Sequence, residues 1–308
     1  MIVAILLLVV GFLALVKGAD WFVDGAATLA SKFGIPQLVV GLTIVAMGTS
    51  LPEAAVSITS GIKGNAGITI GNIVGSNILN ILIILGITAV ITNVRIQMST
   101  LRYEIPFMLL ITVGLLFMGM GDGQIAAFEG IILWLFFIIY LIYLFKLTKK
   151  SNVKDEESTL RDLTVFQCIC YGVLGMILVV AGSNLVVNGA TDIAQSLGMS
   201  ERFIGLTIVA FGTSLPELVT SVCAALKGNS GIAIGNIVGS NIFNILFVIG
   251  TVALICPVPF EQKFIFDVVV AILSGVLLLA GTIKHKELRR GFGVVLLISY
   301  AAYFIYLL

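Results

Sequence analysis

The hexapeptide GTSLPE occurs twice, at residues 48–53 and again at residues 212–217. Each copy lies inside a long apolar segment, GLTIVAMGTSLPEAAVSI at 41–58 and GLTIVAFGTSLPELVTSV at 205–222. A shift of 164 residues places residues 41–80 on residues 205–244 without a gap, and 28 of these 40 positions are identical. The chain therefore contains an internal duplication, and we expect the two hexapeptides to share one role.

The composition around the repeats excludes a water-soluble domain. The chain has 308 residues, of which 59% are hydrophobic and only 11% are charged, and its mean hydropathy is +1.16. Soluble domains carry about 25% charged residues. We therefore predict an all-α polytopic membrane protein whose partner is the lipid bilayer. The net charge of +1 does not indicate nucleic-acid binding, and the sequence predicts no cofactor, no enzymatic activity and no obligatory protein partner.

Ten segments are apolar over the roughly 20 residues that a helix needs to span a bilayer. They lie at about 2–24, 36–61, 67–92, 103–119, 125–147, 165–189, 202–225, 232–255, 265–282 and 291–307. The charged stretch at 148–164 reads as a cytoplasmic linker between a first five-helix unit, 1–147, and a second, 165–308. The repeated segments occupy about 36–92 and 202–255, and we interpret the N-terminal segment as a retained helix.

An odd number of helices per unit forces the second copy to insert with the opposite orientation. The distribution of basic residues tests this idea, because cytoplasmic connections are rich in Lys and Arg. The side shared with the N-terminus carries three, Lys63, Arg202 and Lys263. The other side carries thirteen, namely Lys32, Arg95, Arg102, Lys146, Lys149, Lys150, Lys154, Arg161, Lys227, Lys284, Lys286, Arg289 and Arg290. We therefore predict inverted-topology repeats in a multi-pass plasma-membrane protein with both termini extracellular, an arrangement typical of secondary transporters.

Proline interrupts the second and seventh predicted helices. Pro52 has no N–H, so the carbonyl of Gly48 loses its helical partner. Pro216 does the same to Gly212. Unpaired backbone oxygens are tolerated at membrane depth only inside the protein or beside a wet cavity. We expect two broken helices whose carbonyls, near 46–49 and 210–213, are available to a ligand.

Polar side chains line one face of each repeated helix, because they recur at intervals of three and four residues. On the second helix and its copy they are Thr49, Ser50, Glu53 and Ser57, then Thr213, Ser214, Glu217 and Ser221. On the third helix and its copy they are Asn72, Ser76 and Asn80, then Asn236, Ser240 and Asn244. Carboxylates, hydroxyls and amides are hard oxygen donors, which suit Na⁺, Ca²⁺ or Mg²⁺ and disfavour zinc or copper.

Two glutamates inside apolar helices carry most of the functional argument. A charged side chain in a bilayer costs several kcal/mol and marks function by default. The prolines and serines alone could merely kink helices, and the glycines could merely pack them. The other acidic residues of the predicted spans lie near span ends, where we expect an interfacial charge. These are Asp20, Asp24, Glu104, Glu129 and Asp267.

The paired GTSLPE and GNIVGSN segments resemble the two alpha-repeats of the sodium/calcium exchanger family, within the cation/calcium antiporter superfamily. The resemblance covers the whole chain and implies a compact prokaryotic member, because the linker is too short to hold the large calcium-sensing domains of animal exchangers. It implies Glu53 and Glu217 as principal calcium ligands, with Thr49 and Thr213. It places the hydroxyls of Ser50, Ser76, Ser214 and Ser240 and the carbonyls of Ala46 and Ala210 at sodium sites, and Asn80 and Asn244 at the centre.

The expected function is secondary antiport of Na⁺ against Ca²⁺ by alternating access. The resemblance implies an electrogenic exchange that is independent of K⁺, because potassium-dependent relatives carry aspartate where this chain has Asn244. A Ca²⁺/H⁺ exchanger is the alternative, since buried glutamates can also carry protons. The proton-exchanger signature GNxxE is absent where GTSLPE stands. A passive channel is disfavoured by the repeats and broken helices.

Overall fold

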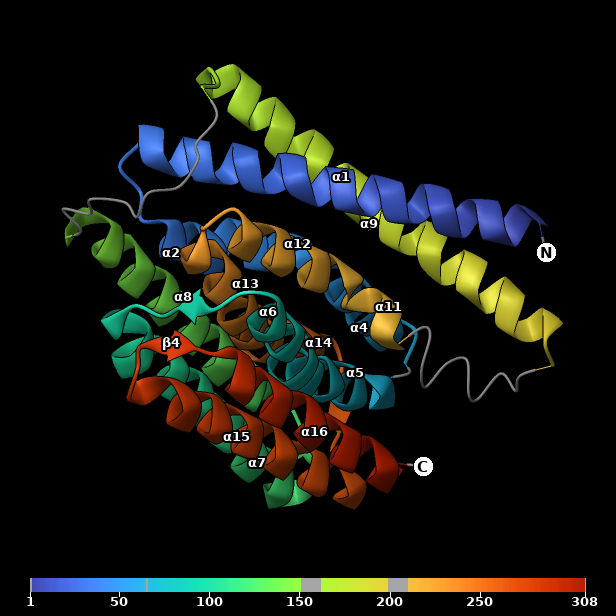
Figure 1. Cartoon of the computed structure of the whole chain (residues 1–308). Helices are drawn as coiled ribbons and strands as arrows, with labels where there is room; N and C mark the ends of the chain where they lie inside the picture. The colour runs from blue at the N-terminus through green and yellow to red at the C-terminus, as the bar shows by residue number, and fades with distance from the viewer. Residues whose placement is uncertain (1, 65, 151–161, 199–209, 308) are drawn as a thin grey trace.

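The computed structural model describes residues 2–64, 66–150, 162–198 and 210–307. The long helices are α1 (Ile2–Lys32), α7 (Ile105–Asp122), α8 (Ala127–Lys150), α9 (Val165–Ser196), α15 (Gln262–Ile283) and α16 (Arg290–Leu307) (Figure 1). A helix satisfies its backbone hydrogen bonds internally, which a chain surrounded by hydrocarbon must do. The all-helical membrane fold expected from the composition is confirmed.

The remaining spans consist of shorter segments that include π-helical turns, labelled η. The second predicted span consists of α2 (Gln37–Val40), η1 (Gly41–Val45), α3 (Ala46–Thr49) and α4 (Leu51–Ile62). The third consists of α5 (Gly67–Leu79), η2 (Asn80–Ile84) and α6 (Leu85–Ile91). In the second half they are α11 (Ala210–Thr213), α12 (Leu215–Leu226), α13 (Ser230–Phe243), η5 (Asn244–Ile249) and α14 (Gly250–Ile255). A further π-helical turn, η3 (Thr100–Glu104), precedes α7. Such turns often occur at functional sites.

Nine of the ten predicted spans are found in the described part of the chain. Eight are single helices long and apolar enough to cross a membrane, and the bent segment Gln37–Ile62 makes the ninth. The span predicted at 202–225 is described only from residue 210, where α12 is a shorter apolar helix. Residues 202–209 lie outside the described residues, so the tenth span stays a prediction.

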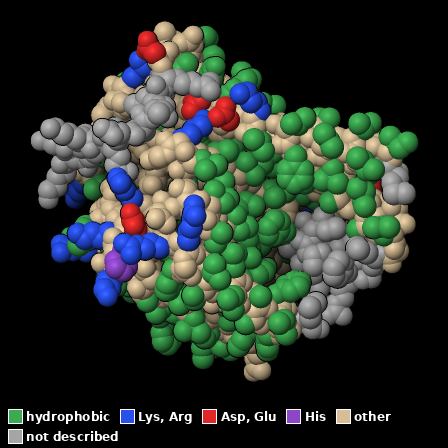
Figure 2. Space-filling view, in the orientation of Figure 1, with side chains coloured by type: hydrophobic (Ala, Val, Ile, Leu, Met, Phe, Trp, Pro, Cys, Tyr) green, Lys and Arg blue, Asp and Glu red, His purple; other side chains and the backbone are tan. Residues whose placement is uncertain are grey.

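The two repeats form the centre of the bundle. In Gly67–Ile91 and Ser230–Ile255, 78% and 83% of the most apolar window is buried, against 11 to 39% in the other single-helix spans. The polar stripes of the repeats are therefore enclosed by protein, and many apolar side chains of the outer helices are exposed at the surface of the bundle. On the face shown in Figure 2, hydrophobic side chains cover the middle, and Lys, Arg and His285 gather at the end where β4 lies.

Helices α1 and α9 lie together along one side of the bundle (Figure 1). Glycines allow their backbones to touch. A Cβ on Gly18 would lie 2.7 Å from the backbone nitrogen of Val179, and one on Gly175 would lie 2.5 Å from that of Phe22. Small residues at the contact are a common means of helix association in lipid. The pair therefore packs as a unit against the central repeats.

Two short antiparallel ribbons connect loops at the ends of the bundle. β1 (Val94–Arg95) pairs with β4 (Glu287–Leu288), and β2 (Gln124–Ile125) pairs with β3 (Val258–Pro259). β1 precedes η3 and α7, and β2 follows α7, so the two ribbons lie at opposite ends of that helix. The shift of 164 residues carries Val94 onto Val258, so one ribbon is the repeat counterpart of the other.

Candidate functional site

Both hexapeptides fold as helix breaks, as predicted for the second and seventh helices. Ser50 separates α3 from α4 with φ −84° and ψ 8°, and Ser214 separates α11 from α12 with φ −90° and ψ 3°. The first break bends its span by 50°. Pro52 and Pro216 stand in the first turn of the helix that follows, where a missing N–H is tolerated.

The carbonyl of Gly212, which Pro216 leaves without a helical partner, accepts a hydrogen bond from a side chain of α9. The hydroxyl of Ser183, on α9, donates to the carbonyl oxygen of Gly212 at 2.7 Å. The repeat counterpart of Ser183 is Ala19, whose side chain has no donor. Sequence reasoning did not identify this contact, although the alignment of GADWFVDGA with GSNLVVNGA contains the difference. The two breaks are thus held differently by α1 and α9.

Glu53 and Glu217 stand in the first turns of α4 and α12, and the exposed fraction of each is 1%. Ser50 Oγ donates to Glu217 Oε1 at 2.9 Å. In the mirrored contact, Ser214 Oγ donates to Glu53 Oε1 at 3.4 Å. Among the described residues, the second oxygen of each carboxylate, Oε2, is buried without a hydrogen-bond partner. Each carboxylate is thus held by a serine of the other repeat and keeps one oxygen available.

The threonines of the hexapeptides also reach across the repeats. Thr49 Oγ1 donates to the side-chain oxygen of Asn236 at 2.9 Å, and it lies 3.1 Å from the carbonyl of Val45. Thr213 interacts with the carboxylate of Glu53. Both threonines lie next to the break in their own repeat. Thr49, of the first repeat, contacts α13 of the second, and Thr213, of the second repeat, contacts α4 of the first. Their hydroxyls therefore border the two carboxylates.

Asn72 and Asn236 brace the helices that carry the glutamates. Asn72 Nδ2 donates to Ser57 Oγ at 2.9 Å and to the carbonyl of Glu53 at 3.3 Å. Asn236 Nδ2 makes the same two bonds, to Ser221 Oγ at 2.9 Å and to the carbonyl of Glu217 at 3.3 Å. The polar stripe on the third helix therefore faces the stripe on the second, which the spacing alone did not determine.

Four asparagines connect the third helices of the two repeats. Asn80 Nδ2 donates to Asn241 Oδ1 at 2.9 Å, and Asn244 Nδ2 donates to Asn77 Oδ1 at 3.1 Å. Asn77 and Asn241 also donate to each other's backbone carbonyl, at 3.2 and 3.1 Å. In the described part of the chain, the side-chain oxygens of Asn80 and Asn244 are buried and have no partner. Sequence reasoning missed Asn77 and Asn241, although both belong to the repeated GNIVGSN.

The remaining predicted site residues lie around this centre. Ser76 on α5 and Ser240 on α13 are buried, and Ser240 Oγ lies 3.3 Å from the carbonyl of Ala46. That carbonyl also accepts from the backbone N–H of Ser50 at 3.1 Å, so it keeps a helical partner despite the nearby break. Ala210 is the first residue of α11, and its side chain lies outside the described residues.

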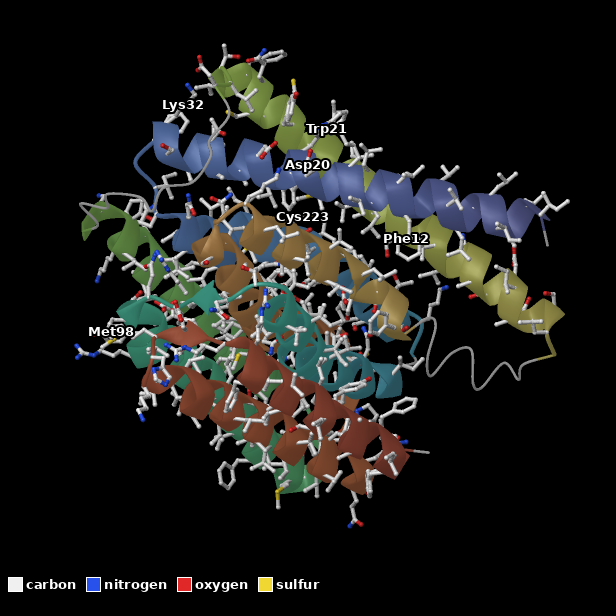
Figure 3. The ribbon with its side chains drawn as sticks, viewed as in Figure 1. Phe12, Asp20, Trp21, Lys32, Met98 and Cys223 are labelled. Carbon is white, nitrogen blue, oxygen red and sulfur yellow. The ribbon has the colours of Figure 1, made fainter. Side chains whose placement is uncertain are left out.

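Two of the acidic residues expected at the membrane interface are buried. Glu104 is 1% exposed and accepts a hydrogen bond from the hydroxyl of Tyr143. Asp24 is 7% exposed and lies 2.5 Å from Lys227 Nζ, which is also 2.6 Å from Asp20. In Figure 3, Asp20 on α1 lies beside the part of α12 that carries Cys223. Neighbouring helices cover Glu104 and Asp24, so these two carboxylates are not exposed although they lie near predicted span ends.

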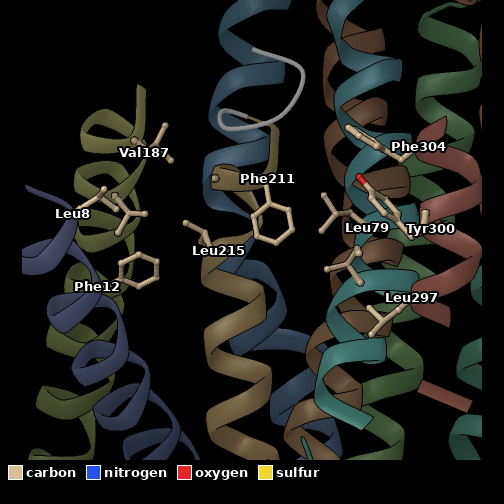
Figure 4. Close-up of a pocket in the computed structure, with 14 residues that line it drawn as sticks. Leu8, Phe12, Leu79, Val187, Phe211, Leu215, Leu297, Tyr300 and Phe304 are labelled. Atoms are coloured by element: carbon tan, nitrogen blue, oxygen red, sulfur yellow. The ribbon is translucent and has the colours of Figure 1, made fainter. Parts of the chain in front are cut away.

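An apolar cavity of about 690 Å³ lies beside the site (Figure 4). Phe12 of α1, Val187 of α9, Leu215 of α12 and Tyr300 of α16 line it. Its walls offer almost no oxygen ligands, so this space does not suit a cation. Twelve buried side-chain oxygens of the described residues have no hydrogen-bond partner, and the four of them that belong to the predicted site are on Glu53, Glu217, Asn80 and Asn244.

The contacts of the centre occur in exchanged pairs. Ser50 and Asn80 of the first repeat contact Glu217 and Asn241, and their counterparts 164 positions later, Ser214 and Asn244, contact Glu53 and Asn77. Such reciprocity is what a two-fold relation between two similar units produces. The centre is therefore built from residues of both repeats.

A sequence model of the family described as "Sodium/calcium exchanger protein" matches residues 3–146 and 168–308. Relatives match over nearly full length. "Inner membrane protein YrbG" of Escherichia coli is 35% identical over 96% of this chain and 94% of its own length. "Sodium/calcium exchanger MaX1" of Methanosarcina acetivorans is 32% identical over 98% and 97% of the two chains.

A solved structure is similar over almost the whole chain. It is that of the sodium-calcium exchanger NCX_Mj soaked with Na⁺ and Sr²⁺, and it is 32% identical in sequence. The TM-score is 0.86, and the match covers 99% of this chain and 98% of the other. The similarity therefore extends through both repeats and the outer helices.

Proposed function

The chain belongs to the sodium/calcium exchanger protein family, and from this premise we propose that it is an antiporter that moves Ca²⁺ in exchange for Na⁺ by alternating access. The observation that carries the proposal is the buried set of four unpartnered oxygens, two from carboxylates and two from amides. Buried polar atoms are normally paired. These four belong to elements that pack together, because α4 contacts η5 and α12 contacts η2, which supports a shared ligand. Oxygen ligands of this kind suit Ca²⁺ and Na⁺.

The proposed ion ligands are those expected from the sequence. Glu53 and Glu217 would bind Ca²⁺ through the oxygens that their serine partners leave available. The wider set comprises Thr49, Thr213, Ser50, Ser214, Ser76, Ser240, Asn80, Asn244 and the carbonyls of Ala46 and Ala210. Asn72 and Asn236 position the glutamates by bonding to their backbone carbonyls.

Charge explains why the two ions would exclude each other. Two ionised carboxylates carry a charge of −2, which one Ca²⁺ neutralises. Several Na⁺ that shared these carboxylates with Ca²⁺ would leave a large positive excess in a buried volume, where the repulsion is strong. If roughly three Na⁺ replace one Ca²⁺, each cycle moves one net charge, and the membrane potential contributes about 2.3 kcal/mol per 100 mV.

Alternating access is supported by the arrangement of the repeats. The two counterpart ribbons lie at opposite ends of α7, which is what an inverted pair of repeats requires. We propose ten spans, an inverted second unit and both termini outside the plasma membrane, with the Lys- and Arg-rich end of Figure 2 in the cytoplasm. Cysteine labelling of the N-terminus in intact cells tests this orientation.

Independence from K⁺ is proposed from the charge of position 244. Asn244 supplies a neutral amide, whose nitrogen donates to Asn77. A carboxylate there would add a negative charge beside Glu53 and Glu217 and favour an additional cation. We expect Na⁺-driven Ca²⁺ uptake to be the same with K⁺ present or replaced by choline.

The decisive experiment is uptake of ⁴⁵Ca²⁺ into proteoliposomes loaded with Na⁺, with external Na⁺ replaced by choline and equal pH on both sides. Uptake should disappear when the Na⁺ gradient is removed and should increase when the interior is made positive, because net positive charge leaves in each cycle. Uptake that ignores Na⁺ and follows an imposed pH gradient would instead establish a proton exchanger and contradict the proposal.

A further inference from the structure

Asn77 and Asn241 form a reciprocal hydrogen-bonded ring, and Asn80 and Asn244 are each attached to it by one further bond. All four side chains are at most 4% exposed, and they belong to adjoining turns of α5–η2 and α13–η5. The two bonds of the ring run from a side-chain nitrogen to a backbone carbonyl, and the two attaching bonds run from a side-chain nitrogen to a side-chain oxygen. Among these four described side chains, only the oxygens of Asn80 and Asn244 have no hydrogen-bond partner.

The backbone carbonyls of Asn77 and Asn241 determine how the amides of Asn80 and Asn244 are oriented. A carbonyl can only accept, so Asn241 must turn its nitrogen toward the carbonyl of Asn77, at 3.1 Å. Its side-chain oxygen then faces Asn80 and must receive a donor. Asn80 therefore presents its nitrogen to Asn241, at 2.9 Å.

The consequence is the direction of the Asn80 oxygen, because an amide has its nitrogen and oxygen on opposite branches. With the nitrogen bound to Asn241, the oxygen is turned away from the ring. The same reasoning applies to the mirrored bonds, in which Asn77 orients Asn244. Without the ring, either amide could rotate and present an NH₂ group, which repels a cation, in place of its oxygen.

We propose that Asn77 and Asn241 are positioning residues, each of which holds the amide of the opposite repeat so that its oxygen faces the transported cation. The proposal rests on the proposed function, since the cation is the one that the carboxylates bind. Each repeat would thus supply one amide ligand and also the residue that orients the ligand of the other repeat. Neither Asn77 nor Asn241 touches the ion.

The test separates orientation from helix packing by replacing the oriented amide. An aspartate at position 80 has two oxygens, so no rotation can present a nitrogen to the cation. Its orientation therefore does not depend on a hydrogen bond to residue 241. The dissociation constant for ⁴⁵Ca²⁺ is measured by equilibrium binding to the purified full chain. The variants are Asn241→Ala and Asn80→Asp, singly and combined, together with Asn241→Ala in an Asn244→Asp background.

Asn241→Ala should weaken Ca²⁺ binding about tenfold in the native background, as expected for the loss of one hydrogen-bonded ligand group. In the Asn80→Asp background the same change should have no adverse effect. In the Asn244→Asp background the tenfold loss should remain, because Asn244 is oriented by Asn77. This last double variant is the matched control, since it carries the same kind of substitution in the wrong repeat.

An equal loss in all three backgrounds would overturn the proposal and leave Asn241 with a packing role only. No loss in the native background would overturn it as well. If Asn241→Ala does not fold, the mirrored set answers the same question, with Asn77→Ala, Asn244→Asp as the rescuing change and Asn80→Asp as the control. Absence of Ca²⁺ binding by the unmodified chain would contradict the proposed function and is distinguishable from these outcomes.

Discussion

The hydroxyl of Ser50 lies 2.9 Å from Oε1 of Glu217, so a residue of the first repeat holds the carboxylate of the second. The reverse contact, from Ser214 to Glu53, measures 3.4 Å. Neither repeat therefore contains a complete site. Any motion that exposes the centre must preserve or exchange these cross-repeat contacts, which makes them the natural first targets for substitution.

Glu53→Gln and Glu217→Gln should each abolish Ca²⁺ flux without unfolding the protein. Glutamine keeps the shape of the side chain but removes one of the two negative charges that neutralise Ca²⁺. Because one oxygen of each buried carboxylate has no hydrogen-bond partner when no ion is bound, its neutral replacement should not lower the melting temperature of the ion-free protein. Added Ca²⁺ should no longer raise that temperature, whereas ligand at about 100 times its dissociation constant stabilises a native protein by about 2.7 kcal/mol. Normal flux in either variant would disprove the site assignment.

Ser50→Ala should impair Ca²⁺ binding more than Ser214→Ala. The Ser50 bond is the shorter of the two, and a hydrogen bond to a charged group contributes about 1.5–3 kcal/mol. We expect a weakening of about tenfold or more for Ser50→Ala and a smaller one for Ser214→Ala, measured as dissociation constants. Ser60→Ala, near the end of α4, is the control and should leave binding unchanged. Equal effects at positions 50 and 214 would show that the difference in distance has no energetic consequence.

Lys227→Met should destabilise the protein, whereas Lys63→Met should not. Lys227 Nζ lies 2.5 Å from Asp24 and 2.6 Å from Asp20, and it joins the end of α12 to α1. Removal of one partner of a buried ion pair costs about 3–5 kcal/mol, and less here because Lys227 is 22% exposed. Lys63 is its repeat counterpart, and the residues corresponding to the two aspartates are Asn184 and Asn188.

Thermal unfolding in detergent measures both lysine variants. The double variant Lys227→Met, Asp24→Asn should recover part of the lost stability, because it leaves no uncompensated charge at position 24. A double variant as unstable as the sum of its single changes would argue that the ion pair itself contributes nothing.

Gly175→Ala should disrupt the pairing of α1 with α9. A Cβ at this position would lie 2.5 Å from the backbone nitrogen of Phe22, which cannot move without displacing the helix. We expect a loss of about 1–3 kcal/mol or more, as for other overpacked contacts. Gly172→Ala is the matched control on the same helix, since nothing lies within 4 Å of its added Cβ. That variant should be neutral or stabilising by up to about 1 kcal/mol. Equal melting temperatures of the two variants would show that the close contact is not required.

The sequence by itself determined the class of the protein, the duplication, the positions of nine of the ten predicted spans and the two helix breaks. These properties depend on local composition and on spacing along one helix. Pro52 breaks its helix whatever surrounds it, and Glu53 is recognisable as functional because a charge in an apolar segment is costly. The chemical type of the site follows from the same residues, since hydroxyls, amides and carboxylates are hard donors in any arrangement.

Only the tertiary structure decided which residue meets which. The spacing places Ser50 and Glu53 close together on one helix, yet Ser50 bonds to Glu217, which lies 167 residues away. The roles of Asn77 and Ser183 depend on a neighbouring helix, and so does the burial of Glu104. Periodicity defines the face that a helix presents, but the partner of that face depends on how distant segments pack. That packing is set by close contacts such as those of Gly18 and Gly175, whose effect appears only when both helices are in place.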